Sequence, residues 1–290
     1  MAFIVHDGKL CRDMWPKYLA RFPNDLDEPS TLPKSRLLPS AYEDLCERVA
    51  VVGNLNRGVD VLAIHPEQNP GEAPGLCVRL QGIVGQVSLT PRGNWNGDVD
   101  DAVKATQSLI LIDLHPGCED SAFARQREAM HDLEELILAQ VHGRRGDEKP
   151  ARVARNGAIN LRKRAFAMPK PGVTGITSTN ADDPDGKVRR MAHLWLVDHR
   201  IMTSVPNSKG RVSMVPPPAI RTGDMVDVAV SVEVVRRRGP GGGYMIEVMF
   251  CPLHVVRLKT VGELRAAITS PNVNHSPPST DPTRSMRRVV

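Results

Sequence analysis

The chain has 290 residues, of which 41% are hydrophobic, 24% are charged and only 4% are aromatic, and its formal net charge is +5. This length allows one large domain or two small ones with a buried core. No apolar run approaches the roughly 20 residues of a membrane helix, and the first residues, MAFIVHDGKLCRD, are too short an apolar stretch for a signal peptide. We therefore expect an intracellular protein, cytoplasmic or nuclear, with no membrane partner.

The five cysteines are scattered along the chain, odd in number and without a CxxC pair. In a reducing compartment this pattern predicts free thiols, with neither disulfides nor a zinc site. We expect no cofactor.

Charge is divided unevenly along the chain. Residues 1–140 carry 13 Lys/Arg against 21 Asp/Glu, a net of −8, whereas residues 141–290 carry 25 against 12, a net of +13. A basic region of this kind favours a polyanionic partner, most often nucleic acid. The low aromatic content argues against a wide platform for stacking bases.

The pattern of prolines, glycines and apolar residues predicts five segments. In chain order these are an extended or partly ordered arm (1–44), strands plus an amphipathic helix (45–142), a basic linker or insert (143–190), an antiparallel hairpin region (191–268) and a disordered tail (269–290).

The first half contains four predicted strands and one predicted helix. The strands are Val49–Val52, Val59–Ile64, Leu76–Leu89 and Ser108–Leu114. Gly82 and Gly85 in the third of them suit a bulge or a sharp bend. The helix covers Glu119–His142, because its apolar residues recur at helical spacing and Gly143 follows as a C-cap.

The second half contains the most regular strand pattern. Met225–Val235 alternates valines with other residues at a strict two-residue period, and Tyr244–Leu258 returns as a second strand with a break at Pro252. Together they predict a long antiparallel hairpin. Ala192–Val197 is a further strand, and Val261–Ile268 forms a closing helical turn.

This order predicts a mostly β protein with one long α-helix. Strands, a helix and two further strands, with glycine bends in Leu76–Leu89, resemble a small barrel of the oligonucleotide/oligosaccharide-binding (OB) type over about Val49 to Leu258. The resemblance is one of pattern, without a diagnostic motif. Two packed β subdomains are the alternative.

Three basic groups are candidate nucleic-acid contacts. They are Arg162, Lys163 and Arg164; Arg189 and Arg190 followed by Trp195; and Arg236, Arg237 and Arg238 followed by Tyr244. The cations would contact phosphates, and Trp195, Tyr244 or Phe166 would stack a base. For each group a plainer reading stays open: a solvated linker, a solvated hairpin tip, or, for Trp195 between two leucines, a core position.

We therefore expect a non-enzymatic protein that binds single-stranded DNA or RNA with low sequence specificity. The alternative is a structural protein that assembles, as a homo-oligomer or within one molecule, by pairing its acidic half with its basic half. In that case the valine hairpin forms the oligomer edge. A remote alternative is a metal-dependent hydrolase using Asp113 and His115, which would share one face of a strand.

Overall fold

The structure is a computed structural model, and it describes residues 1–16, 19, 32–54, 58–63, 75–115, 117–142, 149–150, 157–169, 175–176, 179, 182–207, 211–238 and 244–269. For residues 35, 52–54, 58–63, 142, 149–150, 236–238 and 244 we describe the backbone only. The expected disordered tail lies outside the described residues, apart from Thr269.

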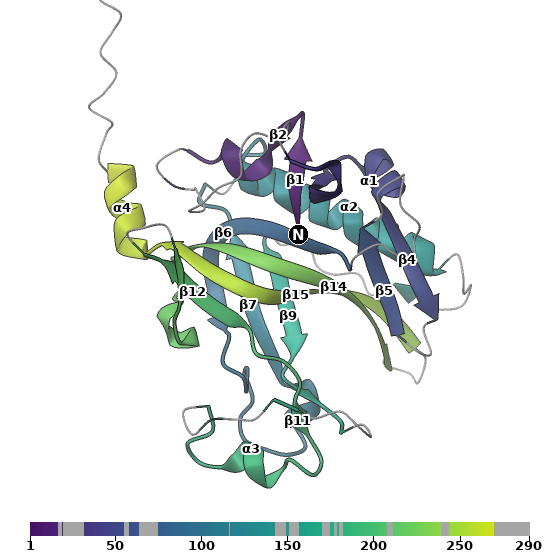
Figure 1. The fold of residues 1–290 in the computed structure, drawn as a ribbon, viewed down its shortest axis with the longest axis vertical. Helices are drawn as coiled ribbons and strands as arrows, with labels where there is room; N and C mark the ends of the chain where they lie inside the picture. Colours follow the sequence, from purple (N-terminus) through teal and green to yellow (C-terminus); the bar gives the residue numbers. More distant parts are fainter. Residues whose placement is uncertain are drawn as a thin grey trace, which may run out of the picture.

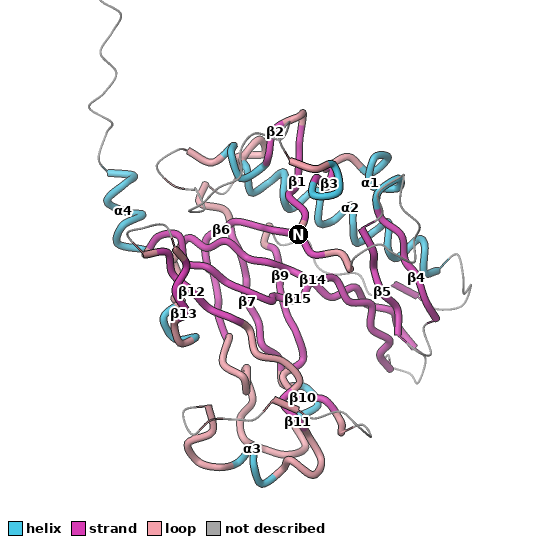
Figure 2. Tube along the Cα trace, in the orientation of Figure 1, coloured by secondary structure: helices cyan, strands magenta, loops and turns pink. Residues whose placement is uncertain are grey.

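The largest part of the described fold is one sheet of thirteen strands (Figures 1 and 2). Its strands are β1 (Ala2–His6), β2 (Lys9–Leu10), β3 (Leu37–Pro39), β4 (Val49–Asn54), β5 (Gly58–Ala63), β6 (Cys77–Ser88), β7 (Thr106–Ile112), β8 (Lys149–Pro150), β9 (Ile159–Arg164), β12 (Met202–Pro206), β13 (Val212–Met214), β14 (Met225–Arg238) and β15 (Tyr244–Lys259). A separate pair is formed by β10 (Phe166–Ala167) and β11 (Leu196–Val197).

The helices are few and short, with one exception. They are α1 (Tyr42–Arg48), α2 (Ala122–His142), α3 (Lys187–Arg190) and α4 (Val261–Thr269), with short 3-10 turns between strands. The expected class, mostly β with one long helix, is therefore confirmed.

The long valine hairpin lies at the centre of the sheet. β14 pairs antiparallel with β15, and its other edge pairs with β6 and, further along, with β5. Because β6 comes from the first half of the chain and β14 from the second, both β blocks share one sheet. The alternative of two packed β subdomains is therefore wrong. Since β14 has partners on both edges, it is also not the open edge that the assembly hypothesis requires.

The sheet curls where β6 bends. The first part of β6 pairs with β14 and the second with β7, with a register shift between Val84 and Gln86 that leaves Gly85 as the extra residue. This is the bend that the two glycines predicted. β7 then pairs with β9, so the neighbour order is β15-β14-β6-β7-β9.

The curled sheet stops short of a barrel. Among the described residues β9 has a backbone ladder with β7 and none with β15. Side chains bridge this seam instead: Arg162 of β9 forms an ion pair with Glu247 of β15, and the Lys163 Nζ lies 2.8 Å from Oε1 of Glu233 on β14. The described sheet is therefore not a closed barrel: one ion pair crosses the β9–β15 seam, and a second joins β9 to β14.

Helix α2 packs on this sheet through the apolar face that the sequence predicted. The side chains of that face are buried: Phe123, Met130, Leu133, Ile137 and Val141. Phe123 lies against Gly82, where a Cβ would come within 3.0 Å of the ring. Glycine at that position therefore allows the helix to approach β6 closely.

Two glutamines of α2 also complete strand edges. The Gln126 Oε1 accepts a hydrogen bond from the backbone N–H of Gln81 at 2.8 Å, and its Nε2 donates to the Gln81 carbonyl at 3.1 Å. Gln140 makes a similar pair of contacts with two residues of β4. Its Oε1 accepts a hydrogen bond from the backbone N–H of Val51 at 2.9 Å, and its Nε2 donates to the Val49 carbonyl at 3.1 Å. Each amide satisfies backbone groups as a neighbouring strand would.

A small lobe lies below the sheet in Figure 1 and carries β10, β11 and α3. It is built from the loop after β6 and the segment after β9, and it has its own apolar cluster of Ala102, Ala105, Ala165, Phe166, Val188, Met191 and Val197. Trp95 and Trp195 pack against this cluster, and the Trp95 ring meets Phe166 edge-on with centroids 5.2 Å apart.

Two segments are more regular than expected. The N-terminal arm contains β1, which pairs in parallel with β6 and with β3. The basic linker contains β9, a strand of the curled sheet that pairs with β7, as well as β10 and α3. Three cations in six residues hid the strand pattern of β9, although Ile159 and Leu161 are buried in the core.

Candidate nucleic-acid interface

The first basic group lies on β9, at the seam of the curled sheet. The Arg162 side chain is 39% exposed and pairs with Glu247, whereas Lys163 is mostly buried beside Glu233. Burial alone would lower the pKa of the Lys163 ammonium, but its hydrogen bond to Glu233 and the charge of that carboxylate raise the pKa above its usual value. Arg164 is exposed, with no hydrogen bond or ion pair in the described part of the chain.

The hairpin group lies next to this one along the strands. Arg236, Arg237 and Arg238 form the end of β14, and the backbone of Arg238 pairs with Tyr244 at the start of β15. Glu247, the partner of Arg162, is only three residues beyond Tyr244. The structure therefore brings the β9 group and the backbone of the hairpin end to the same side of the seam, although the side chains of these four residues are not described.

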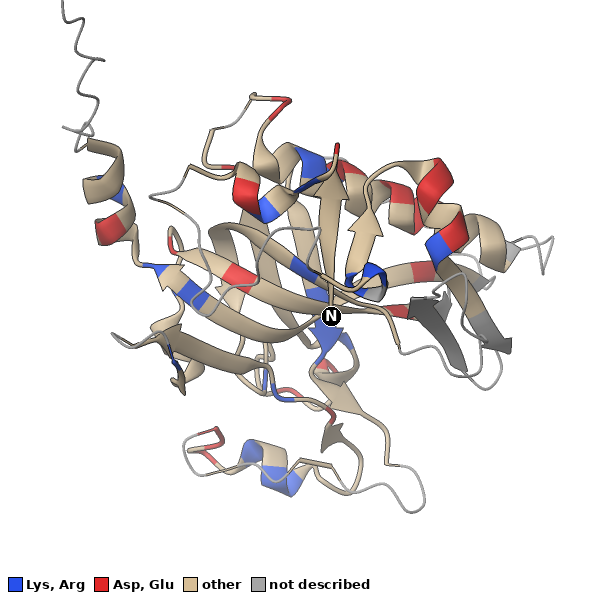
Figure 3. Ribbon diagram, turned by 45° about the horizontal axis from the view of Figure 1, so that its top comes forward, with Lys and Arg blue, Asp and Glu red and all other residues tan. Residues whose placement is uncertain are grey.

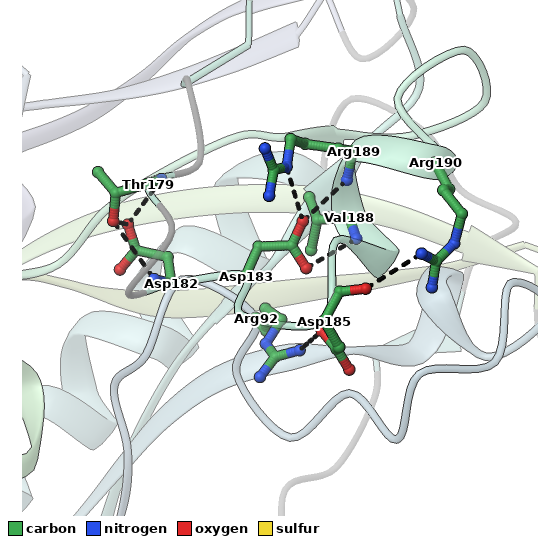
Figure 4. Close-up of polar contacts among 8 residues, drawn as sticks. All are labelled: Arg92, Thr179, Asp182, Asp183, Asp185, Val188, Arg189 and Arg190. Atoms are coloured by element: carbon green, nitrogen blue, oxygen red, sulfur yellow. Dashed lines mark hydrogen bonds and ion pairs between the residues drawn. The ribbon is translucent and has the colours of Figure 1, made fainter.

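The third group lies in the lobe, and Figure 4 shows its polar contacts. The Arg189 side chain is 61% exposed, with its Nε 3.7 Å from the buried Asp183 carboxylate, and Arg190 donates to the Asp185 carbonyl at 3.1 Å. The Asp183 carboxylate also accepts hydrogen bonds from the backbone N–H groups of Val188 and Arg189, both at 3.1 Å. These contacts fix the short helix α3 and leave both guanidinium groups at the surface.

The aromatic residues predicted to stack bases differ in their positions. Phe166 is buried in the lobe core, so the expected stacking role is wrong for this residue. Trp195 is half-buried against the same core, which agrees with the plainer reading given above. Trp95 packs on Phe166 and donates from Nε1 to the Asp98 carbonyl at 2.6 Å.

The described cations of the second half pair mainly with carboxylates of that same half. Besides the pairs above, Arg200 pairs with Asp182 and Arg257 lies 4.0 Å from Asp224. Two ion pairs between described residues cross between the halves: Arg79 with the buried Asp227, and Arg92 with Asp185 at 3.0 Å (Figure 4). Figure 3 shows several acidic residues on helices α1 and α2, and cations on strands, on α3 and on the other helices as well. Among the residues that the structure describes, the two halves are therefore not neutralised by wholesale pairing with each other.

A cavity of about 550 Å³ opens where α2 faces the seam. Its wall includes Arg127, His131 and Glu134 of α2, Asn160 of β9 and Phe250 of β15. Sequence reasoning missed this cavity because its polar residues come from three elements distant in the chain. The only available signal was the run of polar residues at helical spacing on the second face of α2.

Asp113 and His115 have structural contacts instead of a shared metal. The Asp113 carboxylate accepts hydrogen bonds from the Ser121 hydroxyl and, at 3.1 Å, from the His115 backbone N–H. These bonds shape the turn before α2. Within the described ranges, no three His, Cys, Asp or Glu side chains come together in a way that could hold a metal ion.

The five cysteines are free thiols, as expected, and burial raises the pKa of the Cys11 thiol to about 12. No described helix is long and apolar enough to cross a membrane.

Comparison with known proteins gives few matches. No family model matches the chain, and no curated protein does. Among solved structures, the single-stranded DNA-binding protein of bacteriophage Enc34 in complex with single-stranded DNA aligns with a TM-score of 0.31 and 13% identity over 74% of this chain and 97% of that one. A C-terminal truncation of the same phage protein aligns with a TM-score of 0.28 and 13% identity over 74% and 98% of the two chains. At these values the function of this chain has to be argued from its own residues.

Proposed function

We propose that this protein binds single-stranded nucleic acid without an enzymatic step, through the β7–β9 side of an open OB-type barrel. The strand order carries the proposal. We number five strands of the curled sheet in chain order: first β6, second β7, third β9, fourth β14 and fifth β15. Their backbone ladders run in the order fifth-fourth-first-second-third, and a contact between the third and fifth strands would complete the ring of an OB barrel. The contact between the third and fifth strands is the ion-paired seam.

This assignment gives the predicted cations a common position. OB barrels bind oligonucleotides over their second and third strands and the loops after the first and fourth. In this chain the third strand carries Arg162, Lys163 and Arg164, and Arg236–Arg238 lead into the loop after the fourth. The loop after the first strand belongs to the lobe that presents Arg189 and Arg190. We propose that all three basic groups border one route for the strand, with Tyr244 as its stacking residue.

The type of partner follows from the chemistry of these contacts. Guanidinium and ammonium groups pair with phosphates of any sequence, so specificity is low and binding weakens as salt rises. A single strand is favoured over a duplex because it can follow a curved sheet surface and present unpaired bases. Single-stranded DNA and single-stranded RNA both satisfy this description.

The test is fluorescence anisotropy with labelled single-stranded and duplex oligonucleotides at two salt concentrations. Replacing Arg236, Arg237 and Arg238 together by Ala should remove about three phosphate contacts, which lowers the slope of log affinity against log salt by about 2. The matched control removes three exposed cations elsewhere: Lys9, Lys34 and Arg265. Equal effects of the two triple variants, or no binding of single strands at low salt, would contradict the proposal.

A further inference from the structure

The cavity between α2 and the seam has an apolar wall and a polar side. Ile110, Met130 and Phe250 line it, and Met130 and Phe250 are almost wholly buried. Its volume, about 550 Å³, is in the range of sites that hold small organic molecules. An occupant should therefore be flat or compact, with polar groups at its edges.

Several polar groups on the wall are already engaged. Arg162 pairs with Glu247, Glu128 pairs with Arg125 at 2.9 Å, and His131 Nε2 lies 3.0 Å from Glu135. These groups shape the cavity but are not available to a ligand without breaking a contact.

Three other polar side chains of the wall have no such contact. Within the described part of the chain Arg127, Glu134 and Asn160 form no hydrogen bond or ion pair. Glu134 is half-buried, and burial, together with the nearby Glu135, raises the pKa of its carboxyl group, while the positive charge of Arg162 acts in the opposite direction. A partly desolvated carboxylate without a donor is costly, so a ligand that supplies donors gains binding energy there.

Arg127 and Glu134 stand on one face of α2. They are seven residues apart, which places them about 10.5 Å apart along the helix axis at about 1.5 Å per residue. The interval accommodates a two-ring base with one side chain at each edge. The cavity therefore offers a hydrogen-bond donor, the Arg127 guanidinium, at one end and an acceptor, the Glu134 carboxylate, at the other.

We propose that this cavity binds a single guanine base. A carboxylate accepts two parallel hydrogen bonds, and among the bases guanine alone presents two adjacent donors, N1–H and the 2-amino group. Its O6 and N7 are acceptors of the kind that arginine recognises, which matches Arg127. Adenine and cytosine would place a ring acceptor against Glu134, and thymine offers it one donor between two carbonyls.

The same chemistry has two sources: a free guanine nucleotide, or one guanine of a bound strand. The second source rests on the proposed function, whereas the first does not. The carboxylates of Glu128 and Glu134 disfavour a phosphate inside the cavity, so the base enters and the phosphate stays at the opening.

The experiment measures binding to the full chain by calorimetry with dGMP, dIMP, dAMP and dTMP. We expect dGMP to bind at least tenfold more tightly than dAMP or dTMP, and dIMP, which lacks the 2-amino group, to bind about tenfold more weakly than dGMP. Glu134→Gln should abolish this preference, and Arg127→Met should weaken dGMP binding. Glu43→Gln, an exposed glutamate of α1, is the matched control and should behave as the parent. Circular dichroism checks the folding of every variant, and Arg127→Met serves if Glu134→Gln does not fold.

A second arm compares oligo(dT) with oligo(dT) carrying one central guanine, in the parent and in Glu134→Gln. A preference for dGMP that requires Glu134 assigns the site to a free nucleotide, and a preference for the guanine-containing strand assigns it to the strand. The proposal is overturned if neither shows a guanine preference, or if the preference survives in Glu134→Gln. Normal oligo(dT) binding in that case would leave the proposed function intact. Binding of dGMP without binding of any oligonucleotide would refute the function and not the cavity site.

Discussion

Replacing Gln126 by Leu tests how α2 holds the bend of β6. Gln126 is 2% exposed, and its amide satisfies both the N–H and the carbonyl of Gln81, in the gap between the strands that flank β6. Leu has a similar size but neither donor nor acceptor, so it leaves two buried backbone groups unpaired. At about 1–3 kcal/mol for each group, the free energy of unfolding should fall by about 2–6 kcal/mol.

Urea denaturation followed by circular dichroism measures this loss. With a slope of about 3 kcal/mol per molar urea, a loss of 3 kcal/mol moves the midpoint down by about 1 M. Gln86→Leu is the control, because Gln86 lies on the same strand and is exposed. If the midpoint of Gln126→Leu matches that of Gln86→Leu, the amide does not stand in for a strand and the account of the bend is wrong.

Two further predictions concern the lobe and the pH dependence of stability. Asp183→Ala removes the buried carboxylate that accepts two backbone N–H groups of α3, so the lobe should lose about 1–2 kcal/mol and its amides should exchange faster, while the exchange of β14 stays unchanged. Burial lowers the pKa of His254, with Arg79 adding to the shift, and burial likewise lowers the pKa of His199, with Lys163 adding to it. The unfolded chain therefore takes up protons first as pH falls below about 6.5, and the melting temperature should drop between pH 7.5 and pH 5. His254→Asn should reduce that drop, and an unchanged drop would refute the assignment.

Periodicity was sufficient to predict the longest elements. The valine alternation of β14, the glycine bend in β6 and the apolar face of α2 each depend on residues close in sequence, where local rules apply. β9 was missed because the cations that make it a candidate binding strand also obscure its pattern. The pairing of β6 with β14 could not be predicted, since it joins residues nearly 150 positions apart and depends on the packing of the whole sheet.

The candidate site was predictable as residue types but not as an arrangement. The sequence identified Arg162, Lys163 and Arg164 as cations available to phosphates. In the fold the first two lie beside Glu247 and Glu233, whose positions on the final hairpin gave no indication of such contacts. Cations that are paired in the protein bind phosphates only in competition with their carboxylate partners.

That competition provides a test that separates a binding role of Arg162 from a purely structural one. The Glu247 side chain is only 8% exposed, and Glu247→Gln removes its charge while keeping its shape. If Arg162 contacts phosphates, the variant should bind single strands more tightly at low salt, and its salt slope should become steeper by about 0.7 because one more cation is available. If Arg162 serves only to join β9 to β15, the variant should lose stability with no change in the salt slope. Measuring urea midpoints and oligonucleotide affinities on the same samples distinguishes the two outcomes, and the second would remove Arg162 from the proposed interface.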